Sequence, residues 1–353
     1  MRKKLTQSSL RGPALTQVRH VAPVSYGAAE GRVARIYQEL ERDFGMLAPP
    51  IALHSPAPDV LAASWLMLRE TLLVPGVASR AEKEAVASSV SASNECPYCL
   101  RMHAATLSSV LPPASRADRA ADPLTDPSVR ALADWARENS FRDTAGQSPA
   151  PFSSEPAPEF VASAVLLHYH NRMVNVFLGE LPLPPKAPLT ALGPVMRVVM
   201  WLIGSAARTS VPSGTSMELL PAAPLADDLS WAASNPSIAD AYSRATAAVD
   251  EAGRRSAPES VRDLLGAELD AWDGRPPGIS RAWVDERTAA LPPEDRPAGR
   301  LALLTALASY QVDDTVVAAF RATHPEDSAL IDLTSWAALS AARRIGSWMQ
   351  TKS

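Results

Sequence analysis

The sequence predicts an all-α protein, and three observations lead to that prediction. Apolar residues recur at helical spacing in many segments along the chain. The β-branched alternation that strands need is nearly absent. The 32 prolines, together with many alanines, indicate short helices separated by stiff loops. With 353 residues, the chain is long enough for two domains and a sizeable core.

The first half of the chain predicts a series of helices after a disordered start. Residues 1–27 are basic but lack the apolar core of a signal peptide, so we expect a disordered arm there. Residues 28–44 then have apolar side chains one helical turn apart, and residues 59–72 are mostly apolar. Two helices flank the cysteines, and residues 123–139 and 159–179 complete the set.

Residues 79–111 contain the side chains with the most distinctive chemistry. Cys96 and Cys99, the two cysteines of the chain, form a CxxC motif where Pro97 suits the first position of a helix. Cys96, Cys99 and His103 are three and four residues apart and therefore line one edge of that helix. Free N–H groups and the positive end of the helix dipole favour a thiolate at this position.

Glu84 lies on the preceding helix, whose start is marked by the capping-box residues Ser79 and Glu82. A carboxylate on the side that packs against the next helix would be partly buried and able to accept or pass on a proton. A glutamate near a helix start can also serve the helix dipole alone. Both interpretations of Glu84 remain open from the residues themselves.

The cysteine pair could serve redox chemistry, a metal site or inert packing. Redox chemistry is favoured because the two thiols are close together at a helix start. A metal site needs four ligands, which could come from Cys96, Cys99, His103 and Glu84. The usual structural zinc sites draw on a second CxxC or an HxxxH, and the chain has neither. Haem attachment needs a histidine directly after the second cysteine, where Leu100 stands. The residues therefore call for no metal, haem or flavin cofactor.

These residues resemble the signature of the alkylhydroperoxidase AhpD-like, carboxymuconolactone decarboxylase superfamily. Glu84, Cys96, Cys99 and His103 match its E-x(11)-C-x-x-C-x(3)-H pattern, and NECPYCLRMHAA looks like its peroxidase-related branch. The segment HNRMVNVFLGE resembles the closing helix of that family. The resemblance implies an AhpD-like helical bundle that acts as a thiol-dependent hydroperoxide reductase.

The resemblance also implies a role for each matching residue. Cys99 would be the thiol that attacks the peroxide, and Cys96 would resolve the product as a disulfide. His103 and Glu84 would form the proton relay. The implied partners are a hydroperoxide substrate and an external thiol or dithiol reductant.

Three further residues are expected to support the site. Tyr98 stands where some relatives have a histidine, and it can donate a hydrogen bond but does not titrate near neutrality. We expect Asn171 and Arg172 to brace the site from the closing helix. His170, beside them, is expected to form interhelical hydrogen bonds rather than to act in catalysis.

The second half of the chain repeats the plan of the first half without its chemistry. In the best register, Val312 falls at Cys96 and Thr315 falls at Cys99. We therefore expect two tandem AhpD-like units, the second degenerate and supplying a partner surface to the first. The expected divisions are a disordered arm (1–27), a catalytic unit (28–185), a connecting helix and linker (186–230) and a degenerate unit without the cysteine pair (231–353).

Net charge, hydropathy and cysteine usage limit the classes of partner and the cellular location that we expect. With a net charge of −4, the chain has no overall positive potential that would attract nucleic acid, so we expect no nucleic-acid partner. Residues 191–207 are apolar but too short and too interrupted for a membrane span, so a buried or interfacial helix is expected. Two cysteines in one CxxC motif are not a secreted disulfide framework, which favours the cytoplasm. The resemblance also implies that the protein forms a homo-oligomer, because many relatives self-associate.

Two functions of other classes remain open from the sequence. A disulfide-exchange or redox-sensing protein without efficient peroxide turnover would form the same disulfide without depending on His103. If the protein is an interaction scaffold, replacement of both cysteines would leave its function unchanged. A decarboxylase or lactone-cleaving activity is less expected, since the relatives with those activities usually lack the CxxC pair.

Overall fold

The computed structural model describes residues 2–111, 126–179, 192–206 and 209–349. Within these ranges every regular element is a helix, and an isolated bridge between Val18 and Leu178 is the one pairing of extended backbone. The all-α prediction is confirmed.

The first half of the chain supplies the helices around the cysteine pair. They are, in chain order, α1 (Arg2–Leu15), α2 (Gly31–Glu39), α3 (Pro49–Ala52), α4 (Pro58–Leu68), α5 (Arg80–Ser93), α6 (Pro97–Val110), α8 (Pro127–Glu138), α9 (Ala157–Phe177) and α10 (Leu192–Ala206). Two π-helical segments continue α2 and α4, namely η1 (Leu40–Phe44) and η2 (Arg69–Leu73). The ranges expected at 28–44, 59–72 and 159–179 correspond to α2 with η1, α4 with η2, and α9.

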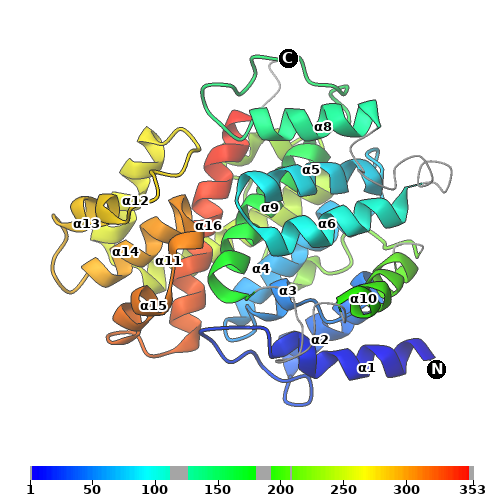
Figure 1. Cartoon of the computed structure of the whole chain (residues 1–353), viewed down its shortest axis with the longest axis horizontal. Coiled ribbons are helices and arrows are strands. Elements are labelled where there is room, and N and C mark those ends of the chain that lie inside the picture. Colours follow the sequence, from blue (N-terminus) through cyan, green and yellow to red (C-terminus); the bar gives the residue numbers. More distant parts are fainter. Residues whose placement is uncertain (1, 112–125, 180–191, 207–208, 350–353) are drawn as a thin grey trace.

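The second half supplies a second group of helices. They are α11 (Pro236–Ser256), α12 (Glu259–Ala271), α13 (Ala282–Thr288), α14 (Arg296–Leu307), α15 (Asp314–Arg321) and α16 (Asp327–Trp348). Short 3₁₀ segments join them, namely η5 (Met217–Leu219), η6 (Asp227–Ala232) and η7 (Ser309–Gln311). In Figure 1 α5, α6 and α10 lie on the right, α12 to α15 lie on the left, and α16 runs between the two groups.

One apolar core runs through both halves of the chain. α9 packs along α16, and α4 packs on α11. The hydroxyl of Tyr242 on α11 donates to the backbone oxygen of Ala162 on α9 at 2.7 Å. Gly346 lets α16 approach α9 closely, because a Cβ there would lie 2.5 Å from a methyl group of Val165. The second half therefore supports the closing helix of the first half.

The second half also reproduces part of the first half's arrangement. α14 packs on α16 as α5 packs on α9. α15 takes the place of α6, but it presents Thr315 and Ala319 to solvent where α6 has Cys99 and His103. The expected boundary at 185/186 lies outside the described residues, and we propose the two-unit division on the packing of these helices.

The first residues differ from the sequence-based expectation of a disordered arm. Residues 2–15 form α1, which packs against the turn after η1. The side-chain amide of Gln7 donates to the backbone oxygens of Glu41 and Gly45 at 2.8 and 2.9 Å. Arg11 forms an ion pair with Glu41 at 2.6 Å. These partners lie about thirty residues away in sequence, so the local composition of the arm gives no sign of them.

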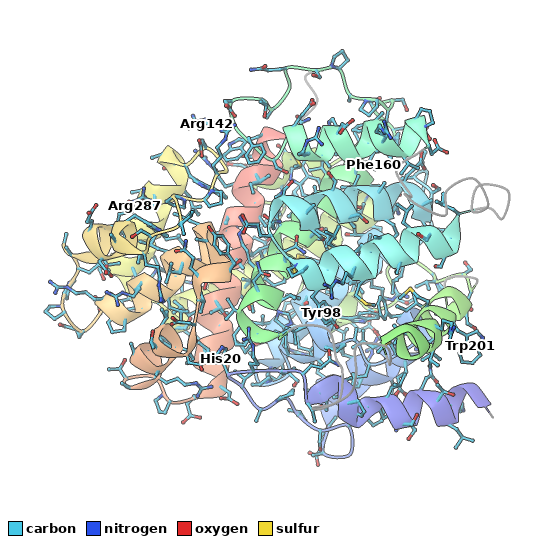
Figure 2. The ribbon with its side chains drawn as sticks, viewed as in Figure 1. His20, Tyr98, Arg142, Phe160, Trp201 and Arg287 are labelled. Carbon is cyan, nitrogen blue, oxygen red and sulfur yellow. The ribbon has the colours of Figure 1, made fainter. Side chains whose placement is uncertain are left out.

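The apolar segment expected at 191–207 forms α10. Leu202 and Ile203 are buried against Met46, while Trp201 is 48% exposed. Figure 2 shows Trp201 at the outer edge of the molecule, on the side where α10 lies. No helix in the described part of the chain is both long and apolar enough to cross a membrane.

Candidate active site

A tight connection between α5 and α6 places the cysteine pair. α5 begins with the predicted capping box, in which Ser79 and Glu82 exchange hydrogen bonds between side chain and backbone. Glu95 has a φ of 49°, and this left-handed residue reverses the chain within two residues of the end of α5. Cys96 then forms the N-cap of α6, and its backbone N–H donates to the Ser91 oxygen at 3.0 Å.

Both cysteines are free thiols and both are buried, with 1% of Cys96 and 4% of Cys99 exposed. Cys99 lies in the first turn of α6 and lines a cavity. Cys96 does not line this cavity. Of the two cysteines, Cys99 is therefore the one that a molecule in the cavity would contact.

The pKa values of the two thiols are shifted in opposite directions. A hydrogen bond from Cys99 lowers the pKa of Cys96 and outweighs the opposing effect of burial. Burial raises the pKa of Cys99 well above its usual value, and the hydrogen bond to Cys96 adds to this effect. The first thiolate therefore forms at Cys96, and the remaining proton stays on Cys99. A reaction that begins at Cys99 needs a base to remove that proton.

His103 and Glu84 form a hydrogen-bonded pair whose chemistry suits such a base. Nδ1 of His103 lies 2.7 Å from Oε2 of Glu84, which is fully buried on α5. When Nδ1–H donates to this carboxylate, Nε2 is left without a proton and can accept one. His103 and Glu84 both line the cavity beside Cys99. The structure thus brings together the four residues of the sequence motif.

Arg80 also contacts the Glu84–His103 pair, although no motif in the sequence indicated it. Its Nε donates to Oε1 of Glu84 at 2.6 Å, and its Nη1 donates to the Leu72 oxygen at 3.0 Å. Burial alone would raise the pKa of Glu84, but the charges and hydrogen bonds of Arg80 and His103 outweigh burial and lower the pKa. The sequence feature that could have predicted this ion pair is the (i, i+4) spacing of Arg80 and Glu84 on one helix.

The three supporting residues lie in different places. Tyr98 is buried and lines the cavity, and burial raises its pKa far above the usual value, so it stays protonated. Asn171 donates to Ser91 Oγ at 3.2 Å, and its hydrogen bonds lower the pKa of both cysteines. Arg172 instead contacts the backbone oxygen of Ala306 on α14. Tyr98 and Asn171 therefore reach the site, and Arg172 points away from it.

His170 on α9 also lines the cavity. As expected, it makes an interhelical hydrogen bond, with Nε2 lying 2.9 Å from Ser64 Oγ. Burial lowers the pKa of His170 well below its usual value, so the ring is neutral. From the sequence, His170 could line a pocket, but the spacing did not place that pocket beside Cys99, because the two residues lie on separate helices.

The rest of the cavity wall is mostly apolar. It comes from η1, α3, α4, α6 and α10, and its apolar residues include Phe44, Met46, Ile51, Leu68, Met102, Val199 and Ile203. Such a wall suits the carbon chain of an organic molecule better than a small polar solute. Among the described residues, no group of three His, Cys, Asp or Glu side chains is placed to hold a metal ion.

Comparison with known proteins agrees with this geometry. The model of the carboxymuconolactone decarboxylase family matches residues 58–109, which span α4 to α6 and include both cysteines. A Mycobacterium tuberculosis protein named alkyl hydroperoxide reductase is 38% identical over 342 residues. That similarity covers 94% of this chain and 95% of the relative. The chain therefore belongs to the carboxymuconolactone decarboxylase family, whose AhpD-like members it resembles in its CxxC motif.

Proposed function

We propose that the protein reduces organic hydroperoxides with the Cys96–Cys99 pair. The position of Cys99 is the main support for this proposal. Cys99 lines an apolar cavity together with the hydrogen-bonded pair of His103 and Glu84. The name of the mycobacterial relative, alkyl hydroperoxide reductase, supports the same reaction class.

In the first step, Nε2 of His103 takes the proton of the Cys99 thiol. The Cys99 sulfur then attacks the terminal oxygen of the hydroperoxide, and the O–O bond breaks. Cys99 becomes a sulfenic acid, and the leaving alkoxide takes a proton from His103 and departs as the alcohol. Glu84 stabilises the imidazolium that exists between the two proton transfers.

In the second step, the Cys96 thiolate attacks the sulfenic sulfur of Cys99. An S–S bond forms, the S–O bond breaks, and the oxygen leaves as water after protonation. The lowered pKa of Cys96 suits this role, because a thiolate is the form that attacks. An external dithiol then reduces the disulfide by exchange and is itself oxidised to a disulfide.

Disulfide exchange with another protein, without peroxide turnover, is the alternative function. The lowered pKa of Cys96 favours it, but the burial of both thiols opposes it, because a partner disulfide must reach the attacking sulfur. Peroxides are small enough to enter the cavity, so burial opposes the oxidation of Cys99 by a peroxide much less.

Rapid mixing of the reduced wild-type protein with a small organic hydroperoxide tests the proposal. We expect fast loss of both thiols, followed by thiol titration and by tryptophan fluorescence. Oxidation no faster than that of free cysteine would exclude the peroxidase, and disulfide substrates would then be tested for the exchange reaction.

We further propose that His170 donates a hydrogen bond to the bound peroxide. Ser64 is fully buried, and the only acceptor for its hydroxyl among the described residues is Nε2 of His170. If Nε2 accepts this bond, the neutral ring carries its proton on Nδ1, which has no partner among the described residues. A neutral donor in the cavity could stabilise the charge that develops on the leaving oxygen.

Replacement of His170 by phenylalanine is therefore expected to slow Cys99 oxidation. Loss of one hydrogen bond to a charged oxygen corresponds to a decrease of about 10-fold to 100-fold in the rate constant. The matched control is His54→Phe, since His54 is also a buried histidine but does not line the cavity. An unchanged rate in the folded His170→Phe protein would exclude a role for the imidazole.

A further inference from the structure

A second, smaller cleft lies between the two halves of the chain. It shares no residue with the cavity that Cys99 lines. Residues 93–95 of the loop before Cys96 form one part of its wall. Trp272 and residues 307–310 of the second half form another part. Two buried hydrogen-bond donors, Arg172 and Ser309, meet there.

Arg172 is a buried cation without a carboxylate partner. It is 5% exposed, and no Asp or Glu of the described residues forms an ion pair with it. The other deeply buried arginine, Arg69, is paired with both Asp43 and Glu70. Burial lowers the pKa of Arg172 to about 9, so the guanidinium is still charged at neutral pH. A buried charge normally requires a counter-charge.

The hydrogen bonds of Arg172 leave one side of the guanidinium free. Nε donates to the Ala306 oxygen near the end of α14 at 2.8 Å, and Nη1 donates to the His168 oxygen at 2.7 Å. The carbonyl end of α14 offsets part of the charge. Nη2 has no acceptor among the described residues, so two N–H groups remain available in the cleft.

Ser309 supplies an independent second donor. It is 6% exposed, and its Oγ accepts a hydrogen bond from Asn175 at 3.1 Å. Its own hydroxyl proton has no acceptor among the described residues. Two buried groups in one cleft therefore have protons to donate and no protein acceptor to receive them.

We propose that this cleft binds a small carboxylate. A carboxylate can accept one hydrogen bond from Nη2 and one from the Ser309 hydroxyl, and it supplies the missing counter-charge. Trp272, whose ring centroid lies 5.7 Å from Cζ of Arg172, forms an apolar wall for the carbon part of the ligand. Glu95 is exposed and also lines the cleft, so its negative charge opposes every anion there, and it opposes a doubly charged one such as phosphate more strongly than a carboxylate.

The proposal gives the second half of the chain a part in ligand binding. Ser309 and Trp272 come from the second half, whereas Arg172 comes from the closing helix of the first half. The site therefore exists only where the two halves meet, and it is independent of the peroxidase activity proposed above.

Titration of the full-length protein with sodium acetate tests the site. Ionic strength is held constant with sodium chloride, and binding is followed by calorimetry and by the thermal unfolding temperature. We expect saturable binding and a rise in the unfolding temperature, both lost in Arg172→Met. The matched control is Arg254→Met, which removes an exposed arginine of α11 and is expected to bind acetate as the wild type does.

Ser309→Ala provides a variant that does not remove a buried charge. Asn175 keeps its hydrogen bond to the Asn94 oxygen at 3.2 Å, so this variant is expected to fold. Loss of one hydrogen bond predicts acetate binding about fivefold to tenfold weaker. A wild-type protein that shows no saturable response to acetate would overturn the proposal. Unchanged binding in Ser309→Ala, or tighter binding of inorganic phosphate than of acetate, would also overturn it.

Discussion

Cys99→Ser is expected to abolish oxidation of the protein by organic hydroperoxides. Cys99 is the cysteine that lines the apolar cavity, and a serine hydroxyl at this position is a far weaker nucleophile towards peroxide oxygen than a thiolate. The fast fluorescence change and the loss of thiols should both disappear in the rapid-mixing experiment. The remaining thiol of Cys96 should then react no faster than free cysteine, because it is buried and does not line the cavity.

Cys96→Ser is the matched control for this prediction. It should keep the first step and lose the second, so that one thiol is consumed and a sulfenic acid accumulates at Cys99. A sulfenic-acid-specific reagent followed by mass spectrometry would detect it. The opposite pattern, in which Cys96→Ser is inert and Cys99→Ser reacts, would show that the cysteines have exchanged roles. The lower pKa of Cys96 makes this comparison necessary.

Glu84→Gln is expected to give the second-largest loss of activity. The glutamine still fills the space, but it no longer supplies the negative charge that fixes the tautomer of His103 and stabilises its imidazolium form. General acid–base catalysis of this kind contributes at least about 10²-fold, so we expect a decrease of that size in the rate constant for Cys99 oxidation. A decrease of less than twofold would exclude Glu84 from the relay.

The same substitution predicts a change in the pH dependence of stability. The folded-state pKa of Glu84 is lowered, so its ionised form stabilises the fold above the unfolded-state pKa. This contribution is lost as the pH falls through the folded-state pKa. The free energy of unfolding of the wild type should therefore exceed that of Glu84→Gln near neutrality, and the difference should shrink in acid. Glu82→Gln, on the same helix, keeps a capping side chain and serves as the control.

The local part of this site can be predicted from neighbouring residues along the chain. Helical spacing places Cys96, Cys99 and His103 along one edge, and the capping box fixes where the preceding helix begins. These features depend on residues within one or two turns of each other, so they can be predicted without knowledge of the tertiary structure. The all-α class follows in the same way, because it is the sum of many local preferences.

The side chains that reach the cysteine motif from other helices depend on the tertiary structure. It placed His170 in the Cys99 cavity, closed that cavity with α10, and turned Arg172 towards the second half rather than towards the thiols. It also ordered α1 through contacts with the turn after η1. Each of these results depends on the angle at which one helix packs against another. Packing angles are set by the shapes of whole helix faces, which no local sequence window contains.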